Sequence, residues 1–417
     1  MPSLASLRLV LCLIGALAAE ASAQHVVVVG SADELQRLLA RRVDSIEIRL
    51  SPGSYHLVPT HHVEPTCGNC IDSLTRVAYT RGVRISGRAV RLVGPQDRSA
   101  EIVTHAGYGL LVEDCVGCTI EGLTITGGER DSSGAATDAA IVVRRSSVEI
   151  VNNRITGNLG DSATVGRLVV GIIGIAGREG SDMHITRNDI TRNSWDGIAL
   201  YRGARADIRG NVIDGVDAAT GPRVGGGRGV AIGITWNAVA TVEENLVRRY
   251  WKGIGVFSNA TAFIRRNVVE EIVTWGVALW GGDSGRPRAE IVDNVVYSTG
   301  ACGVSISRSM SGEEPGRFER NVVVRSGQNP KYDSAEYYCQ QCALALNAVP
   351  VGFLINDNLF FDNRRGDPAL PQLDVSDEAF LRSIPAWCTP LSRVASLGRS
   401  DFLRRYCSDR ELESERP

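Results

Sequence analysis

Hydrophobic and polar positions alternate in short stretches along most of the chain, which predicts strands rather than long helices. Near the start, residues 26–29 (VVVV) form an apolar run, and residues 45–50 (SIEIRL) alternate with a period of two. Between these segments, Ser31 and Glu34 have the spacing of a capping box, so we expect a helix to begin there and continue to about Arg41. Residues 51–55 (SPGSY) then predict a turn.

A motif of Asn followed two residues later by an aliphatic or aromatic residue recurs through the middle of the chain. Its intervals are 35, 23, 34, 22, 27, 27 and 37 residues, so the shortest ones predict a bare coil of 22–23 residues and the longer ones add loops. Because Asn side chains can bond to the backbone of a neighbouring turn, we expect a ladder of stacked Asn residues with a structural role. The motif begins at Asn153, Asn188, Asn211, Asn245, Asn267, Asn294, Asn321 and Asn358.

A second motif, Gly-[Ile/Val]-x-aliphatic, occurs once before each Asn motif from Gly197 onward. In Gly197-Ile-Ala-Leu200, alternation places Ile198 and Leu200 in the core and Ala199 outside. We expect the glycine to supply a positive φ at the bend into the strand. The same interpretation puts further pairs inside: Val230/Ile232, Ile254/Val256, Val277/Leu279 and Val304/Ile306. It leaves small residues outside: Ala231, Gly233, Gly255 and Ala278.

The initial strand, the helix and the following IRLSPGSY segment resemble the N-terminal cap and first coil of the pectin-lyase-like superfamily. This resemblance covers roughly residues 26–363 and implies an all-β fold, a right-handed parallel β-helix (a solenoid) with an N-terminal cap helix. It is specific for the fold and weak for activity, because this scaffold carries lyases, hydrolases, epimerases and binding proteins. After residue 363 the pattern stops, and we expect residues 364–417 to form a partly helical C-terminal cap with helices at 377–383 and 400–406.

The first 23 residues have the pattern of a signal peptide, with Arg8 before an apolar stretch at 9–19 and a small-residue cleavage site at 21–23. The alternative is a buried N-terminal helix. Three segments are therefore expected: a signal peptide at 1–23, the β-helix at 24–363 and the C-terminal cap at 364–417. We expect a secreted protein, periplasmic or extracellular, and a monomer. No later apolar run is long enough to span a membrane, and a net charge of −2 does not favour nucleic acid as a partner.

Ten cysteines are present, and three C-x-x-C pairs stand out: Cys67/Cys70, Cys115/Cys118 and Cys339/Cys342. Export favours disulfide bonds over the zinc sites that such pairs suggest in a cytosolic protein. If the Gly motifs stack, Cys302 and Cys342 lie on successive coils, so we prefer a Cys302–Cys342 bridge to a local Cys339–Cys342 bridge. A Cys388–Cys407 bridge is expected within the C-terminal cap.

The residues that precede the stacked Gly motifs form a column of unusual chemistry. Asp196, Arg228 and Lys252 come first, followed by Trp275, Cys302 and Cys342, with neighbours about 4.8 Å apart. The charged triplet would lie beside a floor of small residues that admits a polymer. Aromatic rings can stack on sugars and Arg can hold carboxylates, so the expected substrate-binding residues are Trp195, Tyr201, Arg202, Trp251, Trp275 and Trp280.

Lys252 is one of only two lysines in a chain that otherwise uses Arg, and a Lys can be tuned into a base where an Arg cannot. We hypothesise that Lys252 removes the C5 proton of a uronic acid, that Arg228 lowers the pKa of Lys252 and neutralises the sugar carboxylate, and that Asp196 orients a partner or returns the proton. This predicts lyase (β-elimination) or C5-epimerase chemistry on an acidic polysaccharide. The alternative is a non-catalytic glycan-binding or cell-surface structural solenoid.

Several family signatures are missing from the chain. The Asn-Thr-Asp, Asp-Asp, Gly-His-Gly and Arg-Ile-Lys motifs of β-helix polygalacturonases do not occur, and neither does the Asp-Pro-His-Asp signature of alginate epimerases. A hydrolase needs two carboxylates across a cleft, and the column supplies only Asp196. We expect no cofactor and no metal. Calcium is the alternative, although no motif supports it. Arg178 and Glu179 are expected to pair as surface ions, and the alternative is that they extend the substrate groove by one coil.

Overall fold

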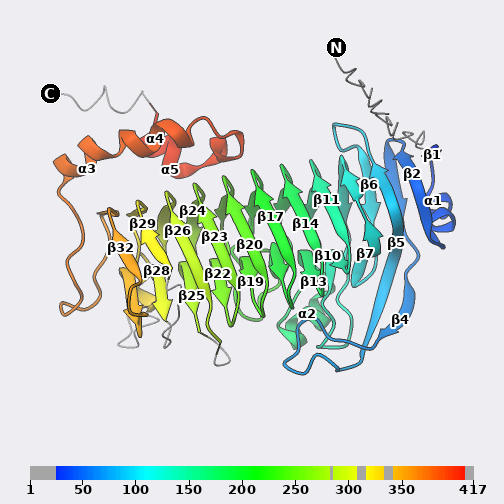
Figure 1. Ribbon diagram of the computed structural model, residues 1–417, viewed down its shortest axis with the longest axis horizontal. Helices are drawn as coiled ribbons and strands as arrows, with labels where there is room; N and C mark the ends of the chain where they lie inside the picture. Colours follow the sequence, from blue (N-terminus) through cyan, green and yellow to red (C-terminus); the bar gives the residue numbers. More distant parts are fainter. Residues whose placement is uncertain (1–24, 282–284, 308–315, 333–340, 409–417) are drawn as a thin grey trace, which may run out of the picture.

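The computed structural model describes residues 25–281, 285–307, 316–332 and 341–408. In these residues the strands stack into coils, and each coil gives one strand to each of three faces (Figure 1). Every strand pairing is parallel except that of β4 with β5. The predicted parallel β-helix is therefore confirmed. The expected signal peptide and Cys339 lie outside the described residues.

The first face carries the candidate site. Its strands, in order along the solenoid, are β4 (Thr60–Glu64), β5 (Val77–Val93), β7 (Tyr108–Val116), β10 (Ala139–Arg144), β13 (Ile173–Arg178), β16 (Ile198–Leu200), β19 (Val230–Ile234), β22 (Lys252–Phe257), β25 (Trp275–Trp280), β28 (Cys302–Ser307) and β31 (Cys342–Asn347). The second half of β5 continues into the second face, where it pairs with β2 and β8, so the two faces form one continuous sheet.

The other two faces complete each coil. The second face contains β1 (His25–Val29), β2 (Val43–Leu50), β8 (Cys118–Glu121), β11 (Ser147–Val151), β14 (Asp182–Thr186), β17 (Arg205–Arg209), β20 (Val239–Glu243), β23 (Thr261–Arg265), β26 (Arg288–Val292), β29 (Arg317–Glu319) and β32 (Leu354–Asn356). The third face contains β3 (Gly53–His56), β6 (Ala100–Val103), β9 (Leu123–Thr126), β12 (Arg154–Thr156), β15 (Asp189–Thr191), β18 (Val212–Asp214), β21 (Leu246–Arg248), β24 (Val268–Ile272), β27 (Val295–Thr299), β30 (Val322–Val324) and β33 (Leu359–Phe361).

The N-terminal end of the solenoid is covered by α1 (Ala32–Leu39). Its start is fixed as the sequence predicts, because Ser31 Oγ accepts a hydrogen bond from Glu34 N at 3.3 Å and Glu34 Oε2 accepts one from Gly30 N at 2.9 Å. Leu35 and Leu39 are buried in the main core, so the helix shields the first coil from solvent.

The Asn ladder is confirmed. Asn188 Oδ1 accepts hydrogen bonds from both the backbone N and Nδ2 of Asn153, at 2.9 and 3.1 Å, and the same double contact repeats from coil to coil as far as Asn358. Each of these Asn residues up to Asn321 is almost fully buried, so the ladder satisfies polar groups that would otherwise be costly inside the solenoid.

The role expected for the motif glycines is wrong. Gly197, Gly276 and Gly303 do not have a positive φ. Their function is close packing: a Cβ added to Gly276 would lie 2.6 Å from the carbonyl oxygen of Gly303 on the next coil, and Gly197 and Gly303 face the next coil in the same way. Glycine therefore lets successive coils approach at this corner.

One coil is out of the predicted register by two residues. Ile198 pairs with Ile232, not with Val230, so Ala231 occupies the position equivalent to Gly197. Consequently Ile232 and Ile234 face the core, Ala231 is also buried there, and Val230 is half-buried at the edge of the face. The expected inward placement of the other pairs is confirmed, since Ile254, Val256, Val277, Leu279, Val304 and Ile306 all belong to the main core.

The C-terminal helices lie along the side of the solenoid, not across its end (Figure 1). They are α3 (Asp377–Ser383), α4 (Pro385–Leu391) and α5 (Asp401–Tyr406), with a short 3-10 helix at Ala395–Arg399. Their buried apolar residues pack on outward residues of the third face, such as Val268 and Val295. The expected helices at 377–383 and 400–406 are found, whereas α4 and α2 (Ser162–Leu168) were not predicted. Within the described residues no helix is long and apolar enough to cross a membrane.

Among the residues that the structure describes, three disulfide bonds are present: Cys67–Cys70, Cys115–Cys118 and Cys388–Cys407. The last one confirms the bridge expected within the C-terminal helices. Cys302 and Cys342 are register partners on successive coils, as expected, but their Sγ atoms are 2.8 Å apart, which exceeds the roughly 2.05 Å of a disulfide bond. The predicted adjacency is therefore confirmed and the covalent bond is not formed in this structure.

Candidate functional site

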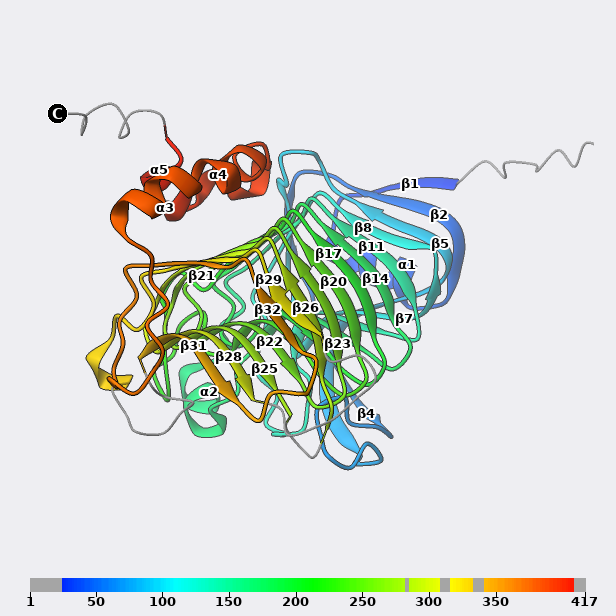
Figure 2. The same cartoon turned by 60° about the vertical axis from the view of Figure 1, so that its left-hand side comes forward.

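The candidate site lies on the outer side of the first face, over the successive strands β16 to β28. Figure 2 shows β22, β25 and β28 of this face side by side. The register gives a column of Asp196, Val230, Lys252, Trp275 and Cys302. Val230 thus stands where Arg228 was expected. Asp196 and Lys252 are separated by one coil, or about 9–10 Å between their Cα atoms.

Arg228 is directed away from this column. Its Nε and Nη2 atoms donate to Gly221 O at 3.1 and 2.7 Å, and Nη2 also donates to Val169 O at 2.5 Å. The side chain is 2% exposed, and its guanidinium lies 5.9 Å from the ring centroid of Trp195. Arg228 therefore ties the glycine-rich loop at residues 221–229 to the end of α2. The predicted triplet of Asp196, Arg228 and Lys252 is wrong.

Lys252 is enclosed by three tryptophans, and we call this group the lysine cage. Its Nζ atom lies 3.9 Å from the ring centroid of Trp251, 5.3 Å from that of Trp275 and 5.2 Å from that of Trp280. Burial lowers the pKa of Lys252 from 10.5 to about 8, although the charge of Asp196 opposes the shift. Burial, not Arg228, therefore lowers the pKa of this amine. Its ammonium form becomes acidic enough to release a proton near neutral pH.

Asp196 is shifted in the opposite direction. Burial raises the pKa of Asp196 from 3.8 to about 7, while a hydrogen bond from Val230 N at 2.6 Å and the charge of Lys252 both oppose the rise. Between pH 7 and 8 the first face therefore holds a partly protonated carboxyl and a partly neutral amine. In such a pair, the protonated carboxyl of Asp196 can donate a proton and the neutral amine of Lys252 can accept one.

The six expected substrate-binding residues divide into two groups. Trp251, Trp275 and Trp280 surround Lys252, and Trp275 and Trp280 meet edge to face with centroids 4.9 Å apart. The other group, Trp195, Tyr201 and Arg202, packs toward the N-terminal coils.

Arg202 and Tyr201 serve a structural purpose. Arg202 Nε donates to Cys67 O at 3.0 Å, Arg202 Nη2 donates to Cys70 O, and its guanidinium lies 4.7 Å from the ring centroid of Trp236. Tyr201 is 6% exposed and packs against the same Trp236 with ring centroids 6.0 Å apart. Neither side chain is available to a ligand on the open part of the face.

The floor of small residues is only partly as expected. Ala199, Gly233, Gly255 and Ala278 do occupy one outward column, as the register shows. However, the ring of Phe257 lies over Gly255, where an added Cβ would collide with it. The surface that a ligand meets is therefore aromatic. Phe257 was missed in the sequence, although its register partner is Trp280 and their rings are 5.8 Å apart.

Residues 57–76, here called the insertion, cover the N-terminal part of the same face. Glu64 Oε1 is 2.8 Å from Arg178 Nη1 and accepts from the Tyr108 hydroxyl at 2.7 Å, and Glu64 Oε2 pairs with Arg144. The predicted pair of Arg178 and Glu179 is confirmed at 2.7 Å, but Arg178 is 0% exposed, so it is not a surface ion. Sequence reasoning missed Glu64 and Arg144 because nothing local marks their long-range partners.

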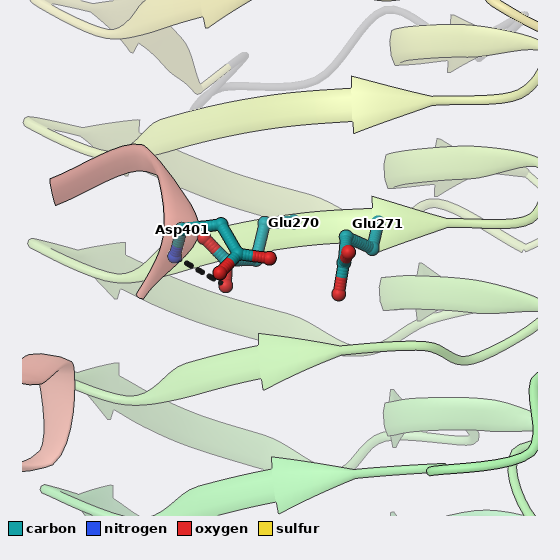
Figure 3. Close-up of side chains that lie close together, drawn as sticks. All are labelled: Glu270, Glu271 and Asp401. Atoms are coloured by element: carbon teal, nitrogen blue, oxygen red, sulfur yellow. Dashed lines mark hydrogen bonds between the residues drawn. The ribbon is translucent and has the colours of Figure 1, made fainter. Parts of the chain in front are cut away.

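A group of three carboxylates lies between β24 and α5 (Figure 3). Ligand atoms of Glu270, Glu271 and Asp401 are all within 4.8 Å of one another. Glu270 is nevertheless satisfied by protein groups, because it accepts from Ser400 Oγ at 2.8 Å and from the backbone N of Asp401 and Phe402 at 3.0 and 3.1 Å. Arg248 pairs with all three carboxylates. We assign this cluster to the docking of α5 on the third face.

The comparison with protein-family models identifies the fold. The family model described as right handed beta helix region matches residues 82–312 and 174–367. No curated protein matches the chain in sequence.

Solved structures resemble the chain at low identity. The Dettilon tailspike protein has a TM-score of 0.42 at 12% identity, with 72% of this chain and 58% of that chain covered. The periplasmic alginate epimerase AlgG has a TM-score of 0.38 at 12% identity, with 76% and 60% covered. A mannuronic acid specific polysaccharide family 6 lyase from human gut microbiota has a TM-score of 0.42 at 10% identity, with 94% and 100% covered. The chain thus spans less than two thirds of the tailspike and of the epimerase.

Proposed function

The chain belongs to the right-handed β-helix family, and on this scaffold we propose that it binds an acidic polysaccharide and modifies it by lyase (β-elimination) or C5-epimerase chemistry. One observation carries the proposal. Lys252 and Asp196 lie on the same outer face, the pKa of one is lowered to about 8 and that of the other raised to about 7, and three tryptophans stand beside them.

In the lyase version, neutral Lys252 Nζ takes the C5 proton of a uronic acid. The electrons of the C5–H bond form a C4–C5 double bond while the C4–O bond breaks, and protonated Asp196 gives its proton to the departing glycosidic oxygen. In the epimerase version the same C5 proton is removed and a proton returns to C5 from the other side of the ring. The half-buried rings of Trp251 and Trp280 supply flat surfaces for neighbouring sugars.

A second candidate function is non-catalytic glycan binding. It is favoured by the position of Arg228, whose guanidinium is occupied by Gly221 O and Val169 O. Without that group, the negative charge that develops when the C5 proton leaves must be stabilised by Lys252 and Asp196 alone. A tryptophan-rich face with one cation can bind an acidic glycan without carrying out this step.

The proposal includes export of the protein. The disulfide bonds Cys67–Cys70, Cys115–Cys118 and Cys388–Cys407 support an oxidising compartment, periplasmic or extracellular. We keep the division into a signal peptide at 1–23, a β-helix at 24–363 and a C-terminal segment at 364–417 as part of this proposal, together with a monomeric state.

The test is incubation with a panel of uronate polysaccharides. Ultraviolet absorbance detects the unsaturated product of a lyase, and deuterium uptake at C5 from heavy water detects an epimerase. Absence of both signals with every polymer would refute the catalytic function, and a measurable affinity would then support binding alone. Lys252→Arg keeps the charge and should abolish turnover, whereas Lys331→Arg changes the only other lysine, which is exposed, and should not.

A further inference from the structure

Two histidines meet on the third face, at the N-terminal end of the solenoid. His56 is the last residue of β3, His105 follows β6, and these two strands pair in successive coils. Although 49 positions separate the two residues in the sequence, His56 Nδ1 lies 3.2 Å from His105 Nε2. The chain contains only six histidines, so the meeting of two of them does not reflect a general abundance of this residue.

The distance between the two nitrogens fits a shared metal ion. Imidazole nitrogens bind Zn²⁺ at about 2.0–2.1 Å, so two of them in adjacent tetrahedral or square-planar positions are roughly 2.9–3.4 Å apart. The 3.2 Å between His56 Nδ1 and His105 Nε2 falls within this range. His56 is exposed and the χ2 torsion of a histidine is broad, so its ring can turn to direct its lone pair at an ion in front of both rings.

A carboxylate lies beside the other nitrogen of His105. Glu129 Oε1 is 3.6 Å from His105 Nδ1, the ring nitrogen that does not contact His56. The negative charge of Glu129 favours a proton on Nδ1, which leaves the lone pair of Nε2 available to a cation. Metal-binding histidines usually have such a carboxylate partner, because it fixes the tautomer and the orientation of the ring. Glu129 is therefore a positioning residue for His105 and not a third ligand.

The three side chains come from three successive coils whose backbones are bonded to one another. The backbone N of His105 donates to Gly127 O at 3.0 Å, and the backbone N of Glu129 donates to Ala106 O at 3.1 Å. The side chains of His105 and Glu129 are 40% and 61% exposed, so an ion can reach the pair directly from solvent. Because the hydrogen-bonded coils already hold the two imidazoles together, binding an ion requires little ordering of the chain.

We infer that His56 and His105 bind one divalent transition-metal cation, Cu²⁺ or Zn²⁺, with Glu129 orienting His105 and with water in the remaining positions. Imidazole suits these ions, whereas Ca²⁺ and Mg²⁺ prefer oxygen ligands. Because the two ligands belong to successive coils, the bound ion clamps the first two coils of the third face together. The site goes beyond the proposed function, since it lies on a different face from the lysine cage and does not depend on any glycan.

The test is isothermal titration calorimetry of the protein without a histidine tag, using Cu²⁺, Zn²⁺, Ca²⁺ and Mg²⁺. We expect one equivalent of Cu²⁺ to bind, and we expect Zn²⁺ to compete for the same site with lower affinity. Ca²⁺ and Mg²⁺ should not compete. Electron paramagnetic resonance of the bound Cu²⁺ should show coupling to the nitrogens of two imidazoles. Absence of a saturable site for Cu²⁺ and Zn²⁺, or competition by Ca²⁺, would overturn the inference.

Substitutions at the other histidines separate this pair from general binding by imidazole. His56→Gln and His105→Gln should each abolish the saturable site and the coupling to two nitrogens. His184→Gln is the matched control, because His184 is exposed and lies 3.9 Å from a carboxylate oxygen of Asp207. His25→Gln is a second control, and both control variants should bind as the native protein does. Circular dichroism checks that each variant folds, and unchanged affinity in folded His56→Gln and His105→Gln would overturn the inference.

The role of Glu129 has a matched control in Glu101, a carboxylate of β6 that accepts from Ser54 Oγ at 3.3 Å. Glu129→Gln should weaken the affinity by about tenfold while coupling to both nitrogens remains. Glu101→Gln removes the same charge from the same end of the third face and should have less effect. Equal losses in the two variants would show that Glu129 acts through surface charge alone and does not orient His105.

The clamp itself is tested by thermal denaturation. An ion that binds the folded pair and not the unfolded chain must stabilise the fold, so Zn²⁺ should raise the midpoint of the native protein and of His184→Gln. The midpoint of His105→Gln should not change. Equal midpoints of the native protein with and without saturating Zn²⁺ would overturn the inference, because the site would then not depend on the stacking of the two coils.

Discussion

The outer side of the first face carries charged side chains both under the insertion and beyond it. Those under the insertion form ion pairs with one another, whereas Lys252, beyond it, is surrounded by aromatic rings. Under the insertion, Arg178 and Arg144 share Glu64, and Arg144 also pairs with Glu113. Beyond it, no carboxylate oxygen of a described residue lies within 4.0 Å of Lys252 Nζ, which is surrounded by tryptophan rings. The same sheet thus holds a closed ionic network and an isolated cation.

The pKa values of two carboxyl groups, those of Glu113 and Asp196, reflect this difference between the two regions. Burial tends to raise the pKa of Glu113, but the hydrogen bond and charge of Arg144 outweigh it, together with Arg84 and Arg145, and the pKa is lowered. Asp196 has no such partner, and burial raises its pKa to about 7. Paired charges of this kind hold the insertion in place, whereas unpaired ones remain able to exchange protons.

The largest expected effect comes from breaking the paired region. Glu64→Gln removes the charge that Arg178 and Arg144 share and leaves Arg178 buried with less compensation. We expect the free energy of unfolding to fall by about 3–5 kcal/mol, measured by urea denaturation. Glu378→Gln, in an exposed pair with Arg382, is the control and should change it by less than about 0.5 kcal/mol. A similar small loss for both would mean that the network does not stabilise the fold.

The same contrast shows which features the sequence could predict. The Asn ladder and the inward aliphatic pairs were predictable because each repeats at the same place in every coil, so one residue supports the assignment of the next. The register at Gly229 was not predictable, because a shift of two residues preserves inside–outside alternation. In addition, Gly229-Val-Ala-Ile matches the motif, whereas the true segment begins with Ala231 and does not.

The site was predicted in part for the same reason. Lys252, Trp275 and Cys302 precede glycines that are truly equivalent, so their column was correct, whereas Arg228 depended on the shifted coil. The attachment of the insertion to the coils was not foreseen, since Arg202 and Cys67 are 135 positions apart and neither belongs to a repeat. The position of a non-periodic segment is determined by tertiary contacts, which a repeat pattern does not reveal. The C-terminal helices are a second example, because packing on the third face determines their position.

Asp196→Asn should have the next largest effect, and it depends on pH. The pKa of Asp196 is about 7 in the folded protein and about 3.8 when unfolded, so the folded state binds more protons between these values. The native protein therefore loses stability as the pH rises from 4 to 7. Asn cannot ionise, so the variant should lack this loss and gain about 4 kcal/mol relative to the native protein at pH 7. Urea denaturation at a series of pH values measures it. Asp207→Asn, at an exposed position in β17, is the control, and parallel pH profiles for native protein and Asp196→Asn would contradict the assigned shift.

Lys252→Met should have a still smaller effect, of the opposite pH dependence. The pKa of Lys252 is about 8 when folded and about 10.5 when unfolded, so charging it in the folded state is unfavourable below pH 8 and this cost disappears as the pH rises to 10.5. The difference between these two pKa values corresponds to about 3 kcal/mol, so we expect the variant to be about 3 kcal/mol more stable at pH 7 and equal to the native protein above pH 10.5. A loss of stability at pH 7 in thermal denaturation would show that the tryptophans more than compensate for the burial of the charge.

The smallest effect on ligand binding is expected from Arg228→Gln. Because the guanidinium is bonded to Gly221 O and Val169 O, its loss should loosen the loop at a cost of about 1 kcal/mol and leave the affinity for a uronate polymer unchanged. Lys252→Met, which removes the cation of the lysine cage, is the comparison and should weaken the same affinity, measured by isothermal titration calorimetry. If Arg228→Gln lowered the affinity by about tenfold or more, the arginine would have to leave its carbonyl partners when the ligand binds. Both cations would then act on the same substrate, and the isolation of Lys252 would be a property of the unliganded protein alone.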